Sequence, residues 1–73
     1  MLSRSDKNYA RRVWAETSDT VRDWITERLE ADASGNAWAE EQLKHFIKLH
    51  KELGSGVQAH RRMYGEYEQQ KLS

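Results

Sequence analysis

The sequence predicts an all-α fold: a small antiparallel helical hairpin or three-helix bundle that forms one domain over residues 1–73. The chain contains no proline and only four glycines, and these are the residues that most strongly interrupt helices. Two clusters of turn-forming residues, 32–36 and 54–56, divide the chain into three segments whose apolar residues recur at helical spacing. We therefore expect helices at about 5–32, 37–53 and 56–71.

The first predicted helix, 5–32, has its apolar residues in a single helical phase. They fall in an arc of about 160° and comprise Ala10, Val13, Trp14, Val21, Trp24, Ile25 and Leu29. The weak point is the segment 17–20, where four poor helix formers follow one another. A break there, with Ser18 or Thr20 capping a new helix, is the alternative. Because the phase carries through this segment, we predict one long helix.

The second predicted helix, 37–53, has clear signals at both ends. Asn36 can cap its first turn, and Gly54 can supply the left-handed residue that ends it. Its apolar side spans about 180° and includes Trp38, Ala39, Leu43, Phe46, Ile47, Leu49 and Leu53. An arc this wide is typical of a helix with two neighbours, so we expect Trp38 and Leu49 to meet either the third helix or another chain.

The third predicted helix, 56–71, has a thinner apolar side. Ser55 and Gln58 match the capping box S-x-x-Q, while Gly65 costs about 1 kcal/mol relative to alanine inside a helix. The apolar side is formed by Val57, Met63, Tyr64 and Tyr67. We expect this helix to pack loosely or to become ordered on a partner.

The composition argues against an enzyme. The chain has no cysteine, which excludes disulfides, thiolate zinc sites and thiol nucleophiles. His45 and His50 lie about 140° apart on a helix and cannot converge on one metal ion. The sequence Gly54-Ser55-Gly56 matches neither a nucleophile elbow nor a phosphate-binding loop. We therefore expect no enzymatic activity, no metal and no cofactor.

The hydropathy pattern predicts a soluble, cytoplasmic protein. No apolar run approaches the roughly 18–20 residues of a membrane span, and the N-terminus lacks the apolar stretch of a signal peptide. Small cysteine-free chains without motifs are common among accessory proteins of phages and mobile elements, which makes such a source our prior expectation.

The charges balance overall but are segregated along the chain. The chain has twelve Lys and Arg residues and twelve Asp and Glu residues. Residues 1–12 hold four cations against Asp6 alone, and residues 16–32 hold six acids against Arg22 and Arg28. In one long helix this order opposes the helix dipole, although solvated charges tolerate such an arrangement. The functional interpretation is that two chains pack these helices antiparallel, with each basic end against an acidic end.

Nucleic-acid binding is the alternative function. The basic residues that would carry it are Arg4, Lys7, Arg11, Arg12, Arg61 and Arg62. The helix-turn-helix outline would make residues 37–52 the recognition helix, but Glu40 and Glu41 near its start would be repelled by phosphates. The chain also has no net positive charge with which to release counterions.

We therefore favour a non-enzymatic protein-interaction module, such as an adaptor, inhibitor or assembly factor. Three tryptophans are many for a chain of this size, and tryptophan is enriched at interface hot spots. A core in a chain below about 70–80 residues rarely supplies more than roughly 3–5 kcal/mol, so association with a partner is common. We expect a homodimer, or docking on a larger protein, through an edge formed by Trp38 and Leu49 and a face formed by Tyr64 and Tyr67.

Overall fold

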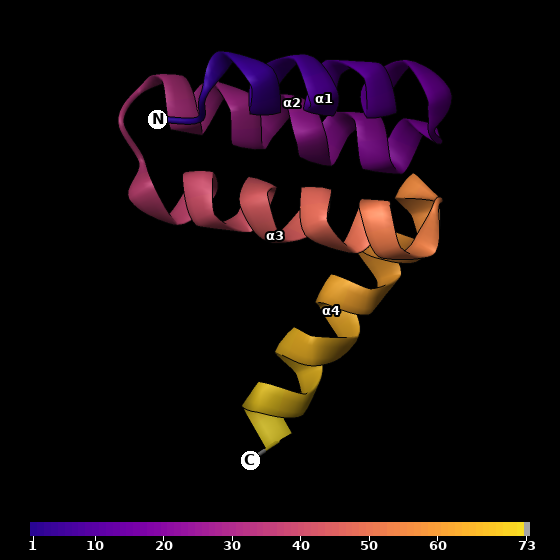
Figure 1. Ribbon diagram of the computed structural model, residues 1–73. Helices are drawn as coiled ribbons and strands as arrows, with labels where there is room; N and C mark the ends of the chain where they lie inside the picture. Colours follow the sequence, from indigo (N-terminus) through magenta and orange to yellow (C-terminus); the bar gives the residue numbers. More distant parts are fainter. Residues whose placement is uncertain (73) are drawn as a thin grey trace.

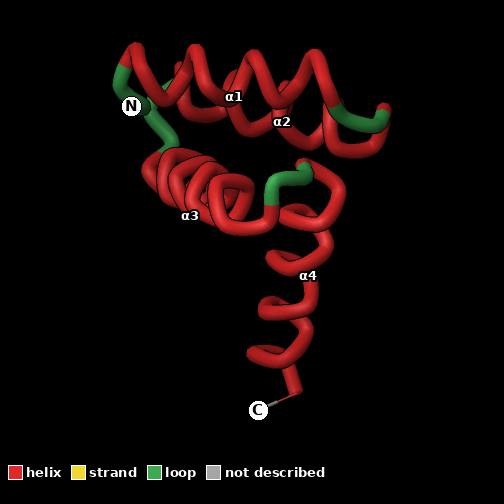
Figure 2. Tube along the Cα trace, turned by 45° about the vertical axis from the view of Figure 1, so that its right-hand side comes forward, coloured by secondary structure: helices red, strands yellow, loops and turns green. Residues whose placement is uncertain are grey.

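The computed structural model describes the backbone of residues 1–72 and the side chains of residues 1–66. This part of the chain folds into the helices α1 (Arg4–Glu16), α2 (Asp19–Ala33), α3 (Ala37–Leu53) and α4 (Gly56–Leu72). α1 and α2 lie side by side and run in opposite directions, α3 crosses this pair obliquely, and α4 leaves the end of α3 at a steep angle (Figure 1 and Figure 2). The all-α class is confirmed, with four helices rather than three.

The prediction of one long helix over 5–32 is wrong. Thr17 and Ser18 have extended backbone (φ −118°, ψ −179° and φ −74°, ψ 162°), so the chain turns back between Glu16 and Asp19. Arg22 stabilises this break because its Nε and Nη2 groups donate to the carbonyls of Trp14 (2.8 Å) and Ala15 (3.1 Å) at the end of α1. These bonds satisfy carbonyls that the helix itself leaves free. The alternative, a break followed by a new helix, is the one observed. Ser18 occupies the N-cap position, but its side chain makes no capping hydrogen bond within the described residues.

The start of α1 is tied to the end of α2. The backbone N–H of Leu2 donates to both carboxylate oxygens of Asp32, at 3.0 and 3.1 Å. Both residues are buried, and a buried carboxylate is costly unless it accepts hydrogen bonds. This contact and the Arg22 contacts therefore hold α1 and α2 together at opposite ends of the pair.

The core lies where all four helices meet. Its largest fully buried apolar side chains are Phe46, Ile25, Leu43, Met63, Val13 and Val21. The central helix is α3, which packs against α1, α2 and α4. The wide apolar arc predicts two neighbours, and the break in the first predicted helix supplies the third. α4 is anchored through Ala59 and Met63, which are 0% and 1% exposed.

The turn between α3 and α4 agrees with the sequence-based signals. Gly54 has φ +72° and donates its N–H to the His50 carbonyl at 2.7 Å. The Ser55 hydroxyl accepts from the Gln58 N–H at 3.4 Å, as the capping box predicts. Gly56 lies directly against α1, because a Cβ at this position would be 2.7 Å from Thr17 Oγ1. The two turns at this end of the molecule therefore pack against each other.

Candidate protein-interaction surface

Five side chains from α2, α3 and α4 form a continuous row that we call the aromatic stack: Trp38, Arg28, Trp24, His60 and Tyr64. The Arg28 Cζ lies 4.9 Å from the centre of the Trp38 ring and 5.5 Å from that of Trp24. The His60 ring centre is 5.5 Å from Trp24 and 4.6 Å from Tyr64, edge to face in both cases. Trp38 and Tyr64, at the two ends of the stack, are 57% and 46% exposed.

Arg28 is held in place by neighbours on two sides. Its Nε donates to the Oε1 of the buried Gln42 at 2.6 Å, and its Nη1 lies 3.8 Å from a Glu27 carboxylate oxygen. A guanidinium fixed between two indole rings gains from cation–π attraction at each face. The side chains at the Trp38 end of the stack are therefore ordered before any partner binds.

A hollow of about 270 Å³ lies beside the stack, between α2 and α4. Its walls include Trp24, Arg28, His60 and Tyr64, and its rim carries the hydroxyl of Thr20 and the carboxylates of Asp23 and Glu27. The Nε2 atom of His60 is buried and has no hydrogen-bond partner among the described residues. Burial lowers the pKa of His60, and the nearby positive charge of Arg28 lowers it further. The hollow thus combines aromatic walls, a neutral imidazole and an acidic rim.

Of the four residues predicted to bind a partner, the structure brings two to this surface. Trp38 and Tyr64 belong to the aromatic stack, and both are exposed. Leu49 is only 6% exposed and belongs to the hydrophobic core, so it cannot share an exposed edge with Trp38. The side chain of Tyr67 lies outside the described residues. The sequence analysis missed Arg28 and His60, although Arg28 follows Trp24 by four residues, which places both on one helix face.

The tryptophans differ in their burial. Trp24 is 7% exposed and lies 5.1 Å from the Phe46 ring, centre to centre. Trp14 is 41% exposed and belongs to the surface instead. Its Nε1–H donates to Thr26 Oγ1 at 3.1 Å, and the Arg22 guanidinium lies 5.1 Å from its ring centre.

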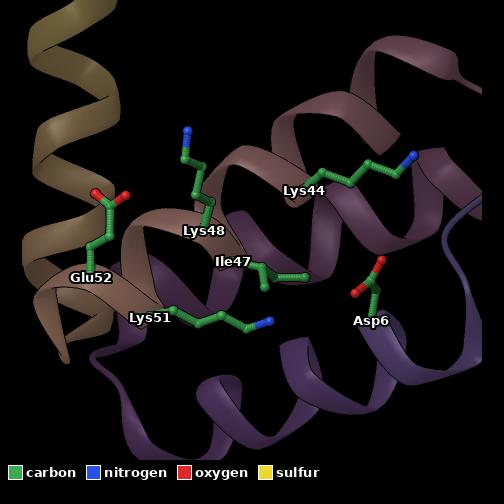
Figure 3. A pocket seen from close by; sticks show the side chains of 6 residues that line it. All are labelled: Asp6, Lys44, Ile47, Lys48, Lys51 and Glu52. Carbon is green, nitrogen blue, oxygen red and sulfur yellow. The ribbon is translucent and has the colours of Figure 1, made fainter.

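The basic residues predicted for nucleic-acid binding do not form one patch. Arg4, Lys7, Arg11 and Arg12 lie on α1, whereas Arg61 and Arg62 lie on α4, which runs away from α1 (Figure 1). The Arg62 Nε is 3.5 Å from Glu66. Instead, α3 presents a second group of cations beside α1. The hollow there has a volume of about 420 Å³. Figure 3 shows its lining, with Lys44, Lys48 and Lys51 around Ile47, Glu52 near the end of α3 and Asp6 on the α1 side.

His45 and His50 each have a side-chain partner. His45 Nε2 lies 2.8 Å from Glu66 Oε2, and this contact is the main reason that the pKa of Glu66 is lowered. The Tyr9 hydroxyl and His50 Nδ1 are 2.7 Å apart. Within the described residues, no three side chains of the metal-binding types come together.

None of the helices in the described part of the chain is both long enough and apolar enough to cross a membrane. A comparison with protein-family models, curated proteins and solved structures finds no match for this chain. Its function must therefore be inferred from the surfaces described above.

Proposed function

We propose that the chain is a non-enzymatic protein-interaction module that docks a protein partner on the aromatic stack. The observation that carries the proposal is the exposure of Trp38 and Tyr64 at the ends of a pre-ordered row of side chains. Tryptophan, tyrosine and arginine are the residues most enriched at interface hot spots. Here all three types lie on one face, next to a hollow that an incoming side chain can fill.

The physical basis of docking is the removal of apolar ring surface from water. Burying exposed apolar surface yields about 25 cal/mol per Å², and rings that are already held lose little conformational freedom on binding. Arg28 is fixed by Gln42 and by the two indole rings before any partner arrives. Such pre-ordering favours a stable complex over a loose hydrophobic encounter.

The test is affinity capture of a partner from a lysate of the source cells. The unmodified protein is compared with the double variant Trp38→Ala, Tyr64→Ala. The matched control is Leu53→Ala, which removes an exposed apolar side chain (38% exposed) outside the stack. We expect the stack variant to lose the captured protein and the control to retain it. Retention by the stack variant, with helical content unchanged, would contradict the proposal.

Polyanion binding is the second candidate function, because α3 gathers three lysines in one hollow, which Asp6 and Glu52 also line. Lys44, Lys48 and Lys51 line the hollow of Figure 3, and binding of a phosphate backbone there would weaken steeply as salt rises. Docking on the aromatic stack should be nearly independent of salt. A nucleic-acid titration at two salt concentrations separates the two functions.

A further inference from the structure

We infer that the exposed face of the α1–α2 hairpin binds a second copy of this chain, with α1 of each copy lying on α2 of the other. This surface differs from the proposed docking site on the α2–α4 side, and the two meet at Asp23, which lies in the acidic row and also lines the hollow beside the aromatic stack. The inference rests on two rows of opposite charge that the fold places next to each other.

The two rows are narrow and lie on neighbouring helices. At 100° per residue, Arg4, Lys7 and Arg11 fall within about 60° on α1, and Asp19, Asp23 and Glu30 fall within about 40° on α2. We call these the basic row and the acidic row. Both consist of exposed residues except Lys7, which is half-buried.

The rows flank a seam formed by Trp14 and Thr26, whose side chains are joined by a hydrogen bond. Trp14 follows Lys7 by seven residues and Arg11 by three, so all three share one face of α1. Thr26 follows Asp19 by seven residues and precedes Glu30 by four, so the acidic row adjoins the seam on α2. The half-exposed indole of Trp14 therefore lies in the middle of the charged face.

Most charges of the two rows have no ion-pair partner within the described residues. Among the side chains that the structure describes, no ion pair joins the basic row to the acidic row. The only ion pair that a row residue makes there is the 3.7 Å contact of Asp19 with Arg22, which lies outside both rows. Folding back at Thr17 and Ser18 places basic and acidic helices next to each other but leaves both rows directed outward. A surface with equal numbers of opposite charges is complementary to itself.

The charge pattern also selects the symmetry of the pair. A two-fold axis parallel to the helices sets α1 over the second copy's α2 and Trp14 beside the other Trp14. An axis perpendicular to the helices would set α1 over α1, and like charges would repel. Because Leu2 lies level with Asp32 and Trp14 level with Thr26, the parallel axis brings Arg4 and Lys7 opposite Glu30.

The size of the face predicts a weak, salt-sensitive pair. Two helices of about 15 residues, each about 22 Å long and 10 Å wide, bury roughly 900 Å² over both copies. This area is below the standard size of a stable interface, and exposed charge pairs are screened by salt. The expected dimer therefore forms at high protein concentration and low ionic strength.

The experiment is light scattering and sedimentation over a concentration series, first on the unmodified chain at about 0.05 M and about 0.5 M salt. We expect self-association at low salt and a loss of affinity of about tenfold or more at high salt. A chain that is monomeric at low salt up to about 1 mM, or one whose association does not respond to salt, would overturn the inference.

The decisive step uses two charge-reversed variants, Arg4→Glu with Arg11→Glu, and Asp23→Lys with Glu30→Lys. Each should be monomeric alone, because its two rows have the same sign. A 1:1 mixture should restore a pair, since the acidic variant complements the basic one at both contacts. The matched control, Lys48→Glu with Lys51→Glu, makes the same charge change on α3 and should still self-associate. A mixture that stays monomeric while both variants remain folded would overturn the inference.

Discussion

Two short connections lie at the same end of the molecule and touch each other, yet they are built in different ways. Thr17 and Ser18, between α1 and α2, contain no glycine and keep ordinary extended backbone. Gly54 and Ser55, between α3 and α4, use a left-handed glycine and a capping hydroxyl. The conformation of the second connection is determined by its own residues, whereas that of the first depends on residues outside it. The comparison shows that a helix can be ended by distant contacts as effectively as by a local signal.

The first connection is stabilised from both sides. Arg22 caps the carbonyls of Trp14 and Ala15, and Gly56 packs against Thr17. Neither contact exists unless the helices have already folded back. By turning the chain back, this connection also places the basic residues of α1 beside the acidic residues of α2.

The largest effect should come from the contact between the two connections. Gly56→Ala would place a Cβ 2.7 Å from Thr17 Oγ1 and 3.2 Å from Val13 Cγ1, and such overpacking typically costs about 1–3 kcal/mol. The measurement is the free energy of unfolding in urea. The control is Gly65→Ala, which also lies in α4 but has open space around it and should stabilise the fold by up to about 1 kcal/mol. Equal behaviour of the two variants would refute the close contact.

A smaller loss should follow removal of the distant cap. Arg22→Ala deletes two hydrogen bonds from a charged donor, and we expect the free energy of unfolding to fall by about 1–2 kcal/mol. Arg11→Ala is the control, since the exposed Arg11 forms no ion pair within the described residues, and it should change stability by less than about 0.5 kcal/mol. If both variants lost the same amount, the break would not depend on Arg22.

The smallest effect should be a change in the free energy of unfolding with pH. It arises partly at His50, which lines a hollow together with residues of both connections. Burial lowers the pKa of His50 from 6.5; the charge of Glu16 opposes this shift and that of Arg12 adds to it. The pKa of His60 is also lowered, by burial and by Arg28. As pH falls through about 6.5, the unfolded chain takes up these protons before the folded chain does, so stability falls.

Urea unfolding between about pH 7.5 and pH 5.5 measures this dependence while leaving most carboxylates ionised. His50→Gln should show a shallower fall, because only His60 then contributes. Stability that stays constant, or rises as the pH is lowered, would be inconsistent with half-buried neutral histidines.

Local signals in the sequence predict most of the fold. The Asn36 cap, the Gly54 stop and the pairing of Ser55 with Gln58 all act within one turn of helix, and all three occur. The break at Thr17 and Ser18 is missed because a shared helical phase is compatible both with one helix and with two that fold back.

The candidate site was less accessible to sequence reasoning. Exposed aromatic residues could be named, but periodicity cannot tell which part of the apolar side of α3 a neighbour covers. Leu49 is buried and Trp38 is not, although both lie on that side. The positions of Arg28 and His60 in the stack depend on how α2, α3 and α4 cross, which is a property of the assembled fold.

The central claim, that α1 folds back on α2 and sets their charged rows side by side, can be tested by one distance. The chain has no cysteine, so the double variant Arg4→Cys, Glu30→Cys accepts exactly two spin labels, and dilution with unlabelled chain removes distances between molecules. Neighbouring antiparallel helices, with axes about 8–10 Å apart, predict a label distance below about 25 Å. A continuous helix over this segment would separate the labels by about 39 Å, and that result would contradict the account.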